Sequence, residues 1–129
     1  MRVNQPILYG FKMAQYEEFT IDQGTDVSIE IHLTNVDGSR KDLDGYIVSA
    51  VMKKNYNSDS ADSLAFTGIV SEPASAGVIN LSLTNLQTDT LRPGKYVYDV
   101  EVKYEEDSVT WVVERVLEGK IFVTPSVTR

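Results

Sequence analysis

Apolar and polar residues alternate with a period of two over much of the chain. From Val27 to Thr34 the odd positions are apolar and the even positions are polar. The same alternation recurs from Ile79 to Thr84 and is strongest from Tyr96 to Tyr104. This period is typical of half-buried β-strands, and no segment sustains the helical period of about 3.6 residues. The pattern therefore predicts an all-β fold.

Three further segments complete the expected set of strands. Tyr46 to Lys53 has two partly apolar faces, and Leu64 to Val70 predicts a weaker strand. Ser108 to Thr124 predicts a long or bulged strand, interrupted near Gly119, because glycine weakens a strand interior. The polar segment from Thr84 to Thr90 suits a single helical turn.

A turn before the strongest strand indicates the architecture. In Leu91-Arg92-Pro93-Gly94-Lys95-Tyr96, the Pro-Gly pair suits a type II turn. The tyrosine that follows matches the tyrosine corner of immunoglobulin-like sandwiches, whose phenol bonds to upstream backbone. With about seven strands at about ten-residue spacing, the sequence predicts an immunoglobulin-like antiparallel β-sandwich. Residues 1–16 show no clear period and predict an N-terminal arm, which leaves 17–129 for the sandwich.

Length and charge exclude several classes of protein. A chain of 129 residues fits one domain, and the absence of cysteine excludes disulfides, thiolate metal sites and a cysteine nucleophile. The apolar run Ile7-Leu8-Tyr9 is too short for a signal peptide, and nothing approaches a membrane span. We expect a soluble protein made in a cytoplasm, without a membrane partner. The net charge of −7 argues against a nucleic-acid partner.

Few side chains suggest chemistry. The single histidine, His32, has no second histidine or thiolate with which to bind zinc, and no serine elbow is present, so a surface histidine is expected. Asp37, Asp42 and Asp44 share one turn region and leave weak calcium binding open, although aspartate is also common in turns. We therefore predict no catalytic residue, cofactor, metal site or small-molecule substrate.

One sheet of the sandwich is expected to carry apolar residues on its outer face. We expect Tyr96, Tyr98, Val100 and Val102 to point inward, together with Val109, Trp111, Val113 and Leu117 of the last strand. The remaining apolar residues of three neighbouring strands then point outward and can merge into a patch, although β-branched residues favour strands on either face. The candidate interface comprises Ile47, Val51, Val97, Val112 and Val116, with Ile7, Leu8, Tyr9 and Phe11 of the arm as a second contact region.

Several segments carry a family resemblance. They are Ile21 to Asp26, Asp42 to Tyr46, Gly77 to Leu83, Leu91 to Val100, Arg115 to Gly119 and Val123 to Arg129. From about Glu17 onward the chain resembles virion structural proteins of tailed bacteriophages, in particular the immunoglobulin-like domain at the N-terminus of upper baseplate proteins.

The resemblance implies a non-enzymatic virion protein that is made in the host cytoplasm. Such a protein would be an assembly or adaptor module of the tail, neck or baseplate, in contact with itself and other virion proteins. A capsid decoration protein is the alternative within this class. Because the chain ends at Arg129, where baseplate proteins continue, we expect an adaptor, neck, baseplate or capsid-surface component rather than a receptor-binding protein.

A carbohydrate-binding module is an alternative from a different class. Sugar platforms need exposed aromatic rings, and most aromatic residues here are expected to point inward, with Tyr9, Tyr16, Tyr56 and Phe122 less certain. A small hydrolase is the third candidate, but the sequence shows no recognisable nucleophile, metal site or positioned pair of acids.

Overall fold

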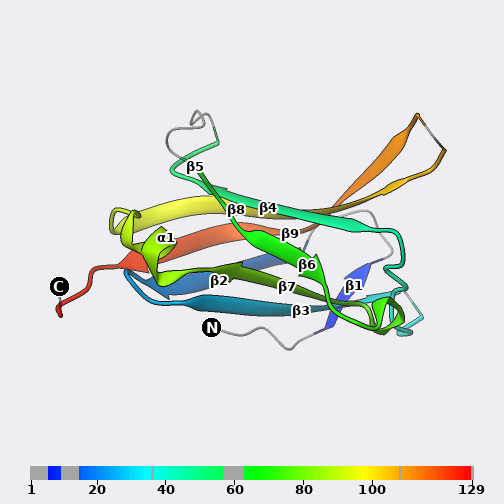
Figure 1. The fold of residues 1–129 in the computed structure, drawn as a ribbon, viewed down its shortest axis with the longest axis horizontal. Helices are drawn as coiled ribbons and strands as arrows, with labels where there is room; N and C mark the ends of the chain where they lie inside the picture. The colour runs from blue at the N-terminus through cyan, green and yellow to red at the C-terminus, as the bar shows by residue number, and fades with distance from the viewer. Residues whose placement is uncertain (1–5, 10–14, 36, 57–62, 108, 129) are drawn as a thin grey trace.

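The computed structural model describes residues 6–9, 15–35, 37–56, 63–107 and 109–128, and these form two packed β-sheets (Figure 1). The strands are β1 (Pro6–Tyr9), β2 (Gln15–Asp22), β3 (Val27–Asn35), β4 (Ile47–Lys53), β5 (Ser63–Ala65), β6 (Thr67–Val70), β7 (Val78–Leu83), β8 (Gly94–Glu105) and β9 (Trp111–Thr124). A 3₁₀ turn at Ala74–Ala76 precedes β7, and a short helix, α1 (Asn85–Asp89), follows it.

The order of the strands is that of an immunoglobulin-like sandwich. One sheet has the order β1-β3-β7-β6 and the other β2-β9-β8-β4-β5. Neighbours are antiparallel except that β1 runs parallel to β3 and β2 runs parallel to β9. The N-terminal segment thus adds a strand to each sheet in turn, and β1 and β2 both draw on residues of the expected arm. The predicted fold class is confirmed.

The inward register predicted for β8 is correct. Tyr96, Tyr98, Val100 and Val102 are all buried between the sheets. Buried phenols need a hydrogen-bond partner, and both tyrosines have one. The Tyr96 hydroxyl donates to the carbonyl oxygen of Arg92 at 2.7 Å, and the Tyr98 hydroxyl donates to that of Glu17 at 2.9 Å. These bonds fix the turn before β8 and the position of β2.

The segment from Leu64 to Val70 differs from the expected single strand. It forms β5, which pairs with β4, and β6, which pairs with β7 in the other sheet. Phe66 lies between the two and is only 7% exposed, and its backbone N–H donates to Ala50 at 2.9 Å. The buried ring anchors the point where the chain crosses from one sheet to the other. The two-residue period of a strand does not predict such a crossing.

The last strand, β9, contains a bulge. Val100 pairs with Leu117, but the next residue, Glu101, pairs with Arg115, so Val116 has no partner on β8. A bulge inserts one residue and reverses the alternation of side chains beyond it. The strand otherwise continues through Gly119, where the interruption was expected.

The bulge overturns most of the orientations predicted for β9. Val116 is 1% exposed and lies in the core, so its outward orientation was wrong. Val112 pairs with Tyr104, on the same face of the sheet as the buried Val102, so its outward orientation was wrong too. Trp111 and Val113, expected inside, are exposed, as is Val109 just before the strand. Only Leu117, at 0% exposure, lies inside as predicted.

Gly119 allows β2 to approach β9. Its φ is +157°, and a Cβ atom there would collide with the carbonyl oxygen of Glu17, its partner in register. Only glycine avoids this backbone contact. The parallel pairing that attaches β2 to the sheet therefore depends on this position.

Candidate functional site

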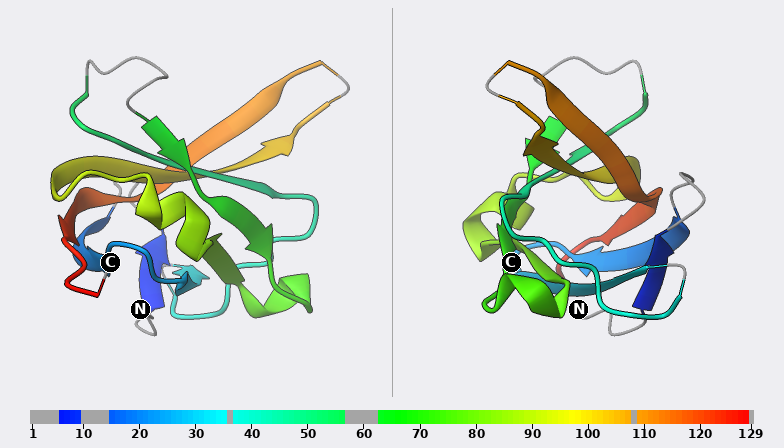
Figure 2. Two further views of the ribbon diagram at one scale, coloured as in Figure 1. Left: turned by 60° about the vertical axis from the view of Figure 1, so that its left-hand side comes forward. Right: turned by 90° about the vertical axis from the view of Figure 1, so that its right-hand side faces the viewer.

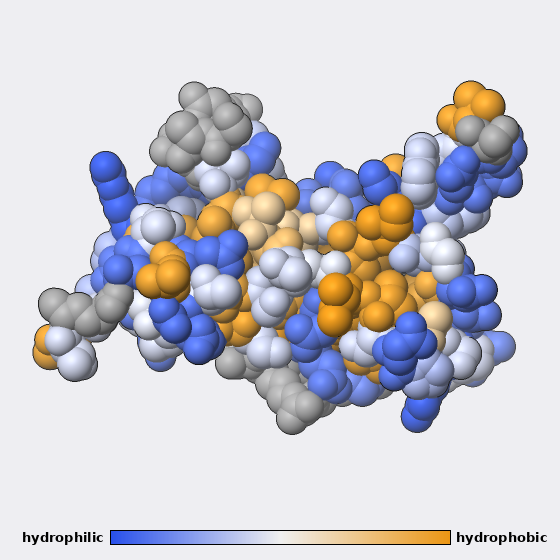
Figure 3. Space-filling model, in the orientation of Figure 1, coloured by the Kyte–Doolittle hydropathy of each residue, from blue (hydrophilic) through white to orange (hydrophobic). Residues whose placement is uncertain are grey.

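The β8–β9 hairpin projects beyond the sandwich (Figures 1 and 2). Pairing between β4 and β8 ends at Ile47 and Lys103, whereas β8 and β9 remain paired as far as Glu105 and Trp111. The end of the hairpin is thus a two-stranded ribbon, and space-filling representation shows hydrophobic atoms at its tip (Figure 3). Beyond Ile47 no described strand pairs with the other edge of β8, so the end of this ribbon lies outside the rest of the five-stranded sheet.

The outer face of this ribbon carries exposed apolar side chains. Val113, Lys103 and Ile47 lie in one row across β9, β8 and β4. The Lys103 ammonium lies 5.0 Å from the centre of the Trp111 ring, which places both on the same face. We call four residues the hairpin patch: Ile47, Val109, Trp111 and Val113, which are 48%, 85%, 44% and 52% exposed.

Acidic residues lie at the tip of the hairpin. One carboxylate oxygen of Asp107 accepts hydrogen bonds from the backbone N–H groups of Val109 and Thr110, both at 2.8 Å. These bonds lower the pKa of Asp107 below its ordinary value. With Glu105 and Glu106 beside it, the turn places three carboxylates next to the hairpin patch.

The opposite face of the hairpin is attached to the body of the protein. The Lys41 ammonium lies 3.8 Å from a carboxylate oxygen of Glu114 and 5.2 Å from the centre of the Tyr46 ring. The rings of Tyr46 and Tyr104 pack with centroids 5.0 Å apart. These contacts leave the outer face as the side available to a partner.

A small pocket lies on the same sheet, nearer its middle. Its volume is about 240 Å³, and it lies over β4, β8 and β9. The lining residues are Val51, Lys53, Tyr56, Val97, Tyr98, Asp99, Arg115 and Glu118. We call it the charged pocket, because two cations and two anions surround an apolar floor.

Ion pairs orient the charges of this pocket. Arg115 Nε lies 3.4 Å from Asp99 Oδ2, and Arg115 Nη1 lies 3.6 Å from Glu118 Oε1. The Arg115 side chain is still 51% exposed, so the ion pairs do not cover it completely. The guanidinium is thus held between two acceptors while remaining open to a ligand.

Two exposed tyrosines flank the charged pocket. Tyr56 lines it and is 77% exposed, and Tyr16 of β2, in register with Glu118, is 54% exposed. The Tyr16 hydroxyl donates to Glu18 at 2.7 Å. This carboxylate raises the pKa of Tyr16, and Tyr56 lies near enough to add to the shift.

The structure separates the residues of the candidate interface. Ile47 belongs to the hairpin patch, whereas Val51 and Val97 line the charged pocket. Val112 and Val116 point inward, as described above. Ile7, Leu8 and Tyr9 form the backbone of β1, but their side chains, like the whole of Phe11, lie outside the described part.

Sequence reasoning missed several exposed residues. These are Val109, Trp111 and Val113 of the hairpin and Arg115 at the charged pocket, whereas Tyr16 and Tyr56 were left uncertain. If Val113 and Arg115 point outward, Glu114 between them must point inward. An inward glutamate is unusual, so the sequence favoured the opposite register. The Oε2 atom of Glu114 is buried 3.8 Å from the Lys41 ammonium, an ion pair too long to be a hydrogen bond.

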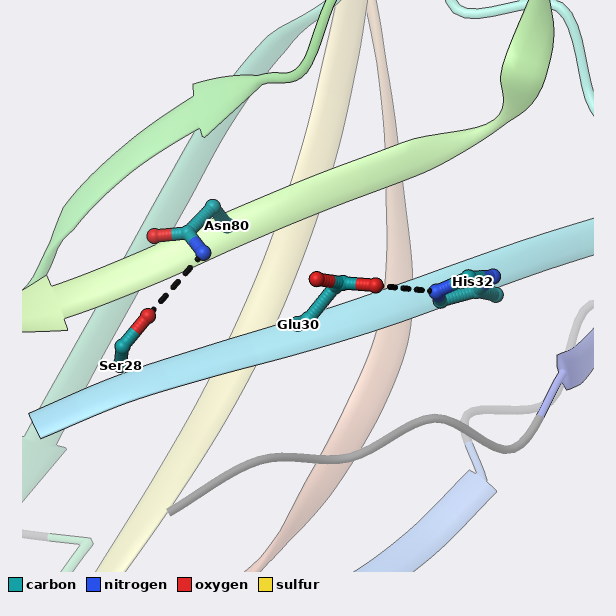
Figure 4. A network of polar contacts seen from close by, with 4 residues as sticks. All are labelled: Ser28, Glu30, His32 and Asn80. Atoms are coloured by element: carbon teal, nitrogen blue, oxygen red, sulfur yellow. Dashed lines mark hydrogen bonds and ion pairs between the residues drawn. The ribbon is translucent and has the colours of Figure 1, made fainter.

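His32 lies on the outer face of the other sheet (Figure 4). Its Nε2 is 2.7 Å from a carboxylate oxygen of Glu30, while Asn80 donates separately to the Ser28 hydroxyl at 3.2 Å. The two pairs are drawn apart in Figure 4, and the only serine among them is bonded to an amide rather than to the imidazole. This geometry is that of a polar sheet surface.

The turn region that contains Asp37, Asp42 and Asp44 was a candidate for weak calcium binding. Two of these carboxylates accept hydrogen bonds from nearby backbone N–H groups. Asp37 accepts hydrogen bonds from the Ser39 hydroxyl and, at 2.9 Å, from the Ser39 N–H, and these two bonds lower the pKa of Asp37. Asp42 accepts from Asp44 N–H at 3.0 Å. Among the described residues no group of three His, Cys, Asp or Glu side chains is placed to hold a metal ion. No described helix is long and apolar enough to cross a membrane.

Hydrophobic surface is also visible where β4 faces β6 (Figure 3). This is the open side of the sandwich, and Ile69 of β6 is 56% exposed there. Val48 and Phe66, which lie behind, are 9% and 7% exposed. The surface is therefore the margin of the core, whereas the hairpin patch extends away from it.

The fold is similar to that of several solved structures. The N-terminal domain of ORF48 from phage TP901-1 superposes with a TM-score of 0.56 and 9% identity, over 95% of this chain and 98% of that one. An internalin-like protein of Listeria monocytogenes gives 0.41 and 15%, over 92% and 30% of the chains. A cysteine protease inhibitor from Entamoeba histolytica gives 0.40 and 10%, over 92% and 96%. No protein-family model and no curated protein matches the sequence.

Proposed function

We propose that this protein is a non-enzymatic structural component of a tailed-bacteriophage virion, an assembly or adaptor module of the tail, neck or baseplate. The likeness to a phage domain over nearly the full length of both chains supports this, as does the independent sequence resemblance to baseplate proteins. The observation that carries the contact role is the hairpin patch on a projecting ribbon. Fold alone does not define function, so the proposal depends on that surface.

The hairpin patch has the character of an interface centre. Trp111 is a large, partly exposed ring, and tryptophan is prominent among residues that dominate binding energy. Val113 and Ile47 extend the apolar area beside it, and burial gains about 25 cal/mol per Å². Lys103 lies between Val113 and Ile47 in the same row and over the Trp111 ring, so the exposed apolar side chains surround one cation. Exposed apolar side chains gathered at one place on a surface often mark a contact site.

The charge around the patch indicates the kind of partner. Glu105, Glu106 and Asp107 border the apolar residues, and the whole chain carries a net charge of −7. A second copy would bring the same carboxylates into contact, which costs free energy. The occupant that fits is another virion protein with an apolar pocket rimmed by lysine or arginine. Such charges would also accelerate association at low salt.

Incorporation into particles tests the proposal. Quantitative mass spectrometry of gradient-purified particles should detect the wild-type protein at a fixed copy number relative to the major tail protein. Val113→Asp should reduce incorporation at least tenfold, since it places a charge in the contact. Leu86→Asp, at an exposed apolar residue of α1, is the matched control and should incorporate normally.

Three results would contradict the proposal. The wild-type protein could be abundant in the infected cell and missing from particles, which would exclude a virion role. Equal incorporation of the two variants would show that the hairpin patch is not the contact. A dimer of the purified protein that Val113→Asp dissociates would assign the patch to a second copy.

A further inference from the structure

The charged pocket combines features that are not needed for docking through the hairpin. It lies nearer the middle of the sheet, over the rows of Val51 and Val97 rather than Ile47. Its walls hold an exposed ring, Tyr56, beside the Arg115 ion pairs, while Val51 and Val97 are half-buried beneath. An apolar or aromatic lining with a few convergent polar groups is the usual composition of a small-molecule site.

The charge balance of the pocket restricts its ligand. Lys53 and Arg115 offset Asp99 and Glu118, so the site presents no net charge. A phosphate or other anion would meet two carboxylates, and a cation would meet a guanidinium and an ammonium. A ligand with many neutral hydroxyl groups avoids both conflicts, since each hydroxyl donates to a carboxylate and accepts from Arg115 or Lys53.

The tyrosines supply the remaining element of recognition. A sugar ring has an apolar C–H face that packs on an aromatic ring, while its hydroxyl edge reaches polar groups. Tyr56 is 77% exposed beside the polar groups, and Tyr16 extends the aromatic surface toward β2. Both tyrosines belong to the small group of aromatic residues whose orientation the sequence left uncertain, and the structure exposes them.

We propose that the charged pocket binds one residue of a neutral saccharide, with Tyr56 stacking on the sugar ring and Arg115, Asp99 and Glu118 bonding to its hydroxyl groups. A volume of about 240 Å³ is slightly below the roughly 300 Å³ at which pockets for drug-sized ligands begin. The size suits a single sugar unit within a longer glycan. The site is independent of virion membership and is tested on the purified protein.

An array of neutral and anionic oligosaccharides, probed with the labelled full-length protein, identifies the ligand class. The best neutral glycan is then titrated into ¹⁵N-labelled protein. The amides of Val51, Val97 and Asp99 should shift on binding, and those of the hairpin patch should not. Tyr56→Ala should weaken binding at least about fivefold, the effect of losing a contact worth about 1 kcal/mol.

A matched control distinguishes stacking at this pocket from non-specific binding of glycans to any exposed aromatic ring. Trp111→Ala removes an exposed ring from the hairpin and should leave the glycan affinity unchanged. Arg115→Met keeps the length of the side chain but removes its donors, and should weaken binding at least as much as Tyr56→Ala. The proposal is overturned if no neutral glycan binds, if only anionic glycans bind, or if Trp111→Ala weakens binding as much as Tyr56→Ala.

Discussion

The bulge at Val116 leads to a sharp prediction about two valines of one strand. Val116 is 1% exposed and Val113 is 52% exposed, whereas uninterrupted alternation gives the opposite assignment. Replacing each by alanine removes the same two methyl groups. The difference in unfolding free energy between the variants therefore reports which side chain is buried.

The magnitude follows from the number of groups removed. Transfer of two methyl groups from the core to water costs about 1.6 kcal/mol, and one buried methylene costs about 0.5–1.5 kcal/mol once cavities are counted. We expect Val116→Ala to lose about 1–3 kcal/mol. Val113→Ala leaves no cavity and should stay within about 0.5 kcal/mol of wild type.

Urea unfolding followed by tryptophan fluorescence and circular dichroism measures both values. Equal slopes with denaturant concentration would show that the variants unfold to comparable states. Thermal unfolding should rank them in the same order, with about 3–5 °C for each kcal/mol in a chain of this size. If Val113→Ala is the more destabilising variant, the bulge is not at Val116. The orientations on which the hairpin patch and the charged pocket depend would then be wrong.

Three other predictions concern the edges and turns of the same sheet. Gly119→Ala should cost about 3 kcal/mol or more, because the new Cβ meets Glu17 backbone, and hydrogen exchange should show β2 losing its protection. Tyr98→Phe should cost about 1–2 kcal/mol in urea unfolding, since the Glu17 carbonyl oxygen loses its buried donor; an unchanged midpoint would rule out that bond. Hydrogen bonds from the Val109 and Thr110 N–H groups lower the pKa of Asp107, so they stabilise the turn above the ordinary carboxyl pKa and are lost as pH falls through the lowered value. The Val109 amide resonance should therefore move with a midpoint below the ordinary carboxyl pKa. Movement of that resonance near neutral pH would contradict the assignment.

The sequence was sufficient for the fold because alternation is strong wherever a strand has one buried face. Val27 to Thr34 alternates without interruption, and Tyr96 to Tyr104 does so except at the outward Val97; the structure buries the expected side of each. The Pro-Gly turn gave the start of β8, and Thr84 to Thr90 indeed holds the short helix α1. In these segments local pattern and tertiary packing agree, as a foldable sequence requires.

The site was less accessible to such reasoning because one inserted residue changes every orientation beyond it. Val112, Val113 and Val116 are chemically identical, so only their pairing partners on β8 distinguish core from surface. Tyr56 lies outside any periodic segment, and its place beside Arg115 depends on tertiary structure. Ile47, Val51 and Val97 were oriented correctly because β4 and β8 pair without a bulge.

The same inserted residue accounts for both surfaces of this sheet. Arg115 and Glu118 are three positions apart, so on a regular strand they would point to opposite faces. With Val116 unpaired, both point outward, which permits the ion pair at 3.6 Å and brings the guanidinium into the charged pocket. The reversal also turns Trp111 and Val113 outward along the projecting ribbon. A bulge that looks like a local irregularity thus supplies the hairpin with an apolar face and the neighbouring pocket with its central cation, which is the placement expected of bulges retained for function.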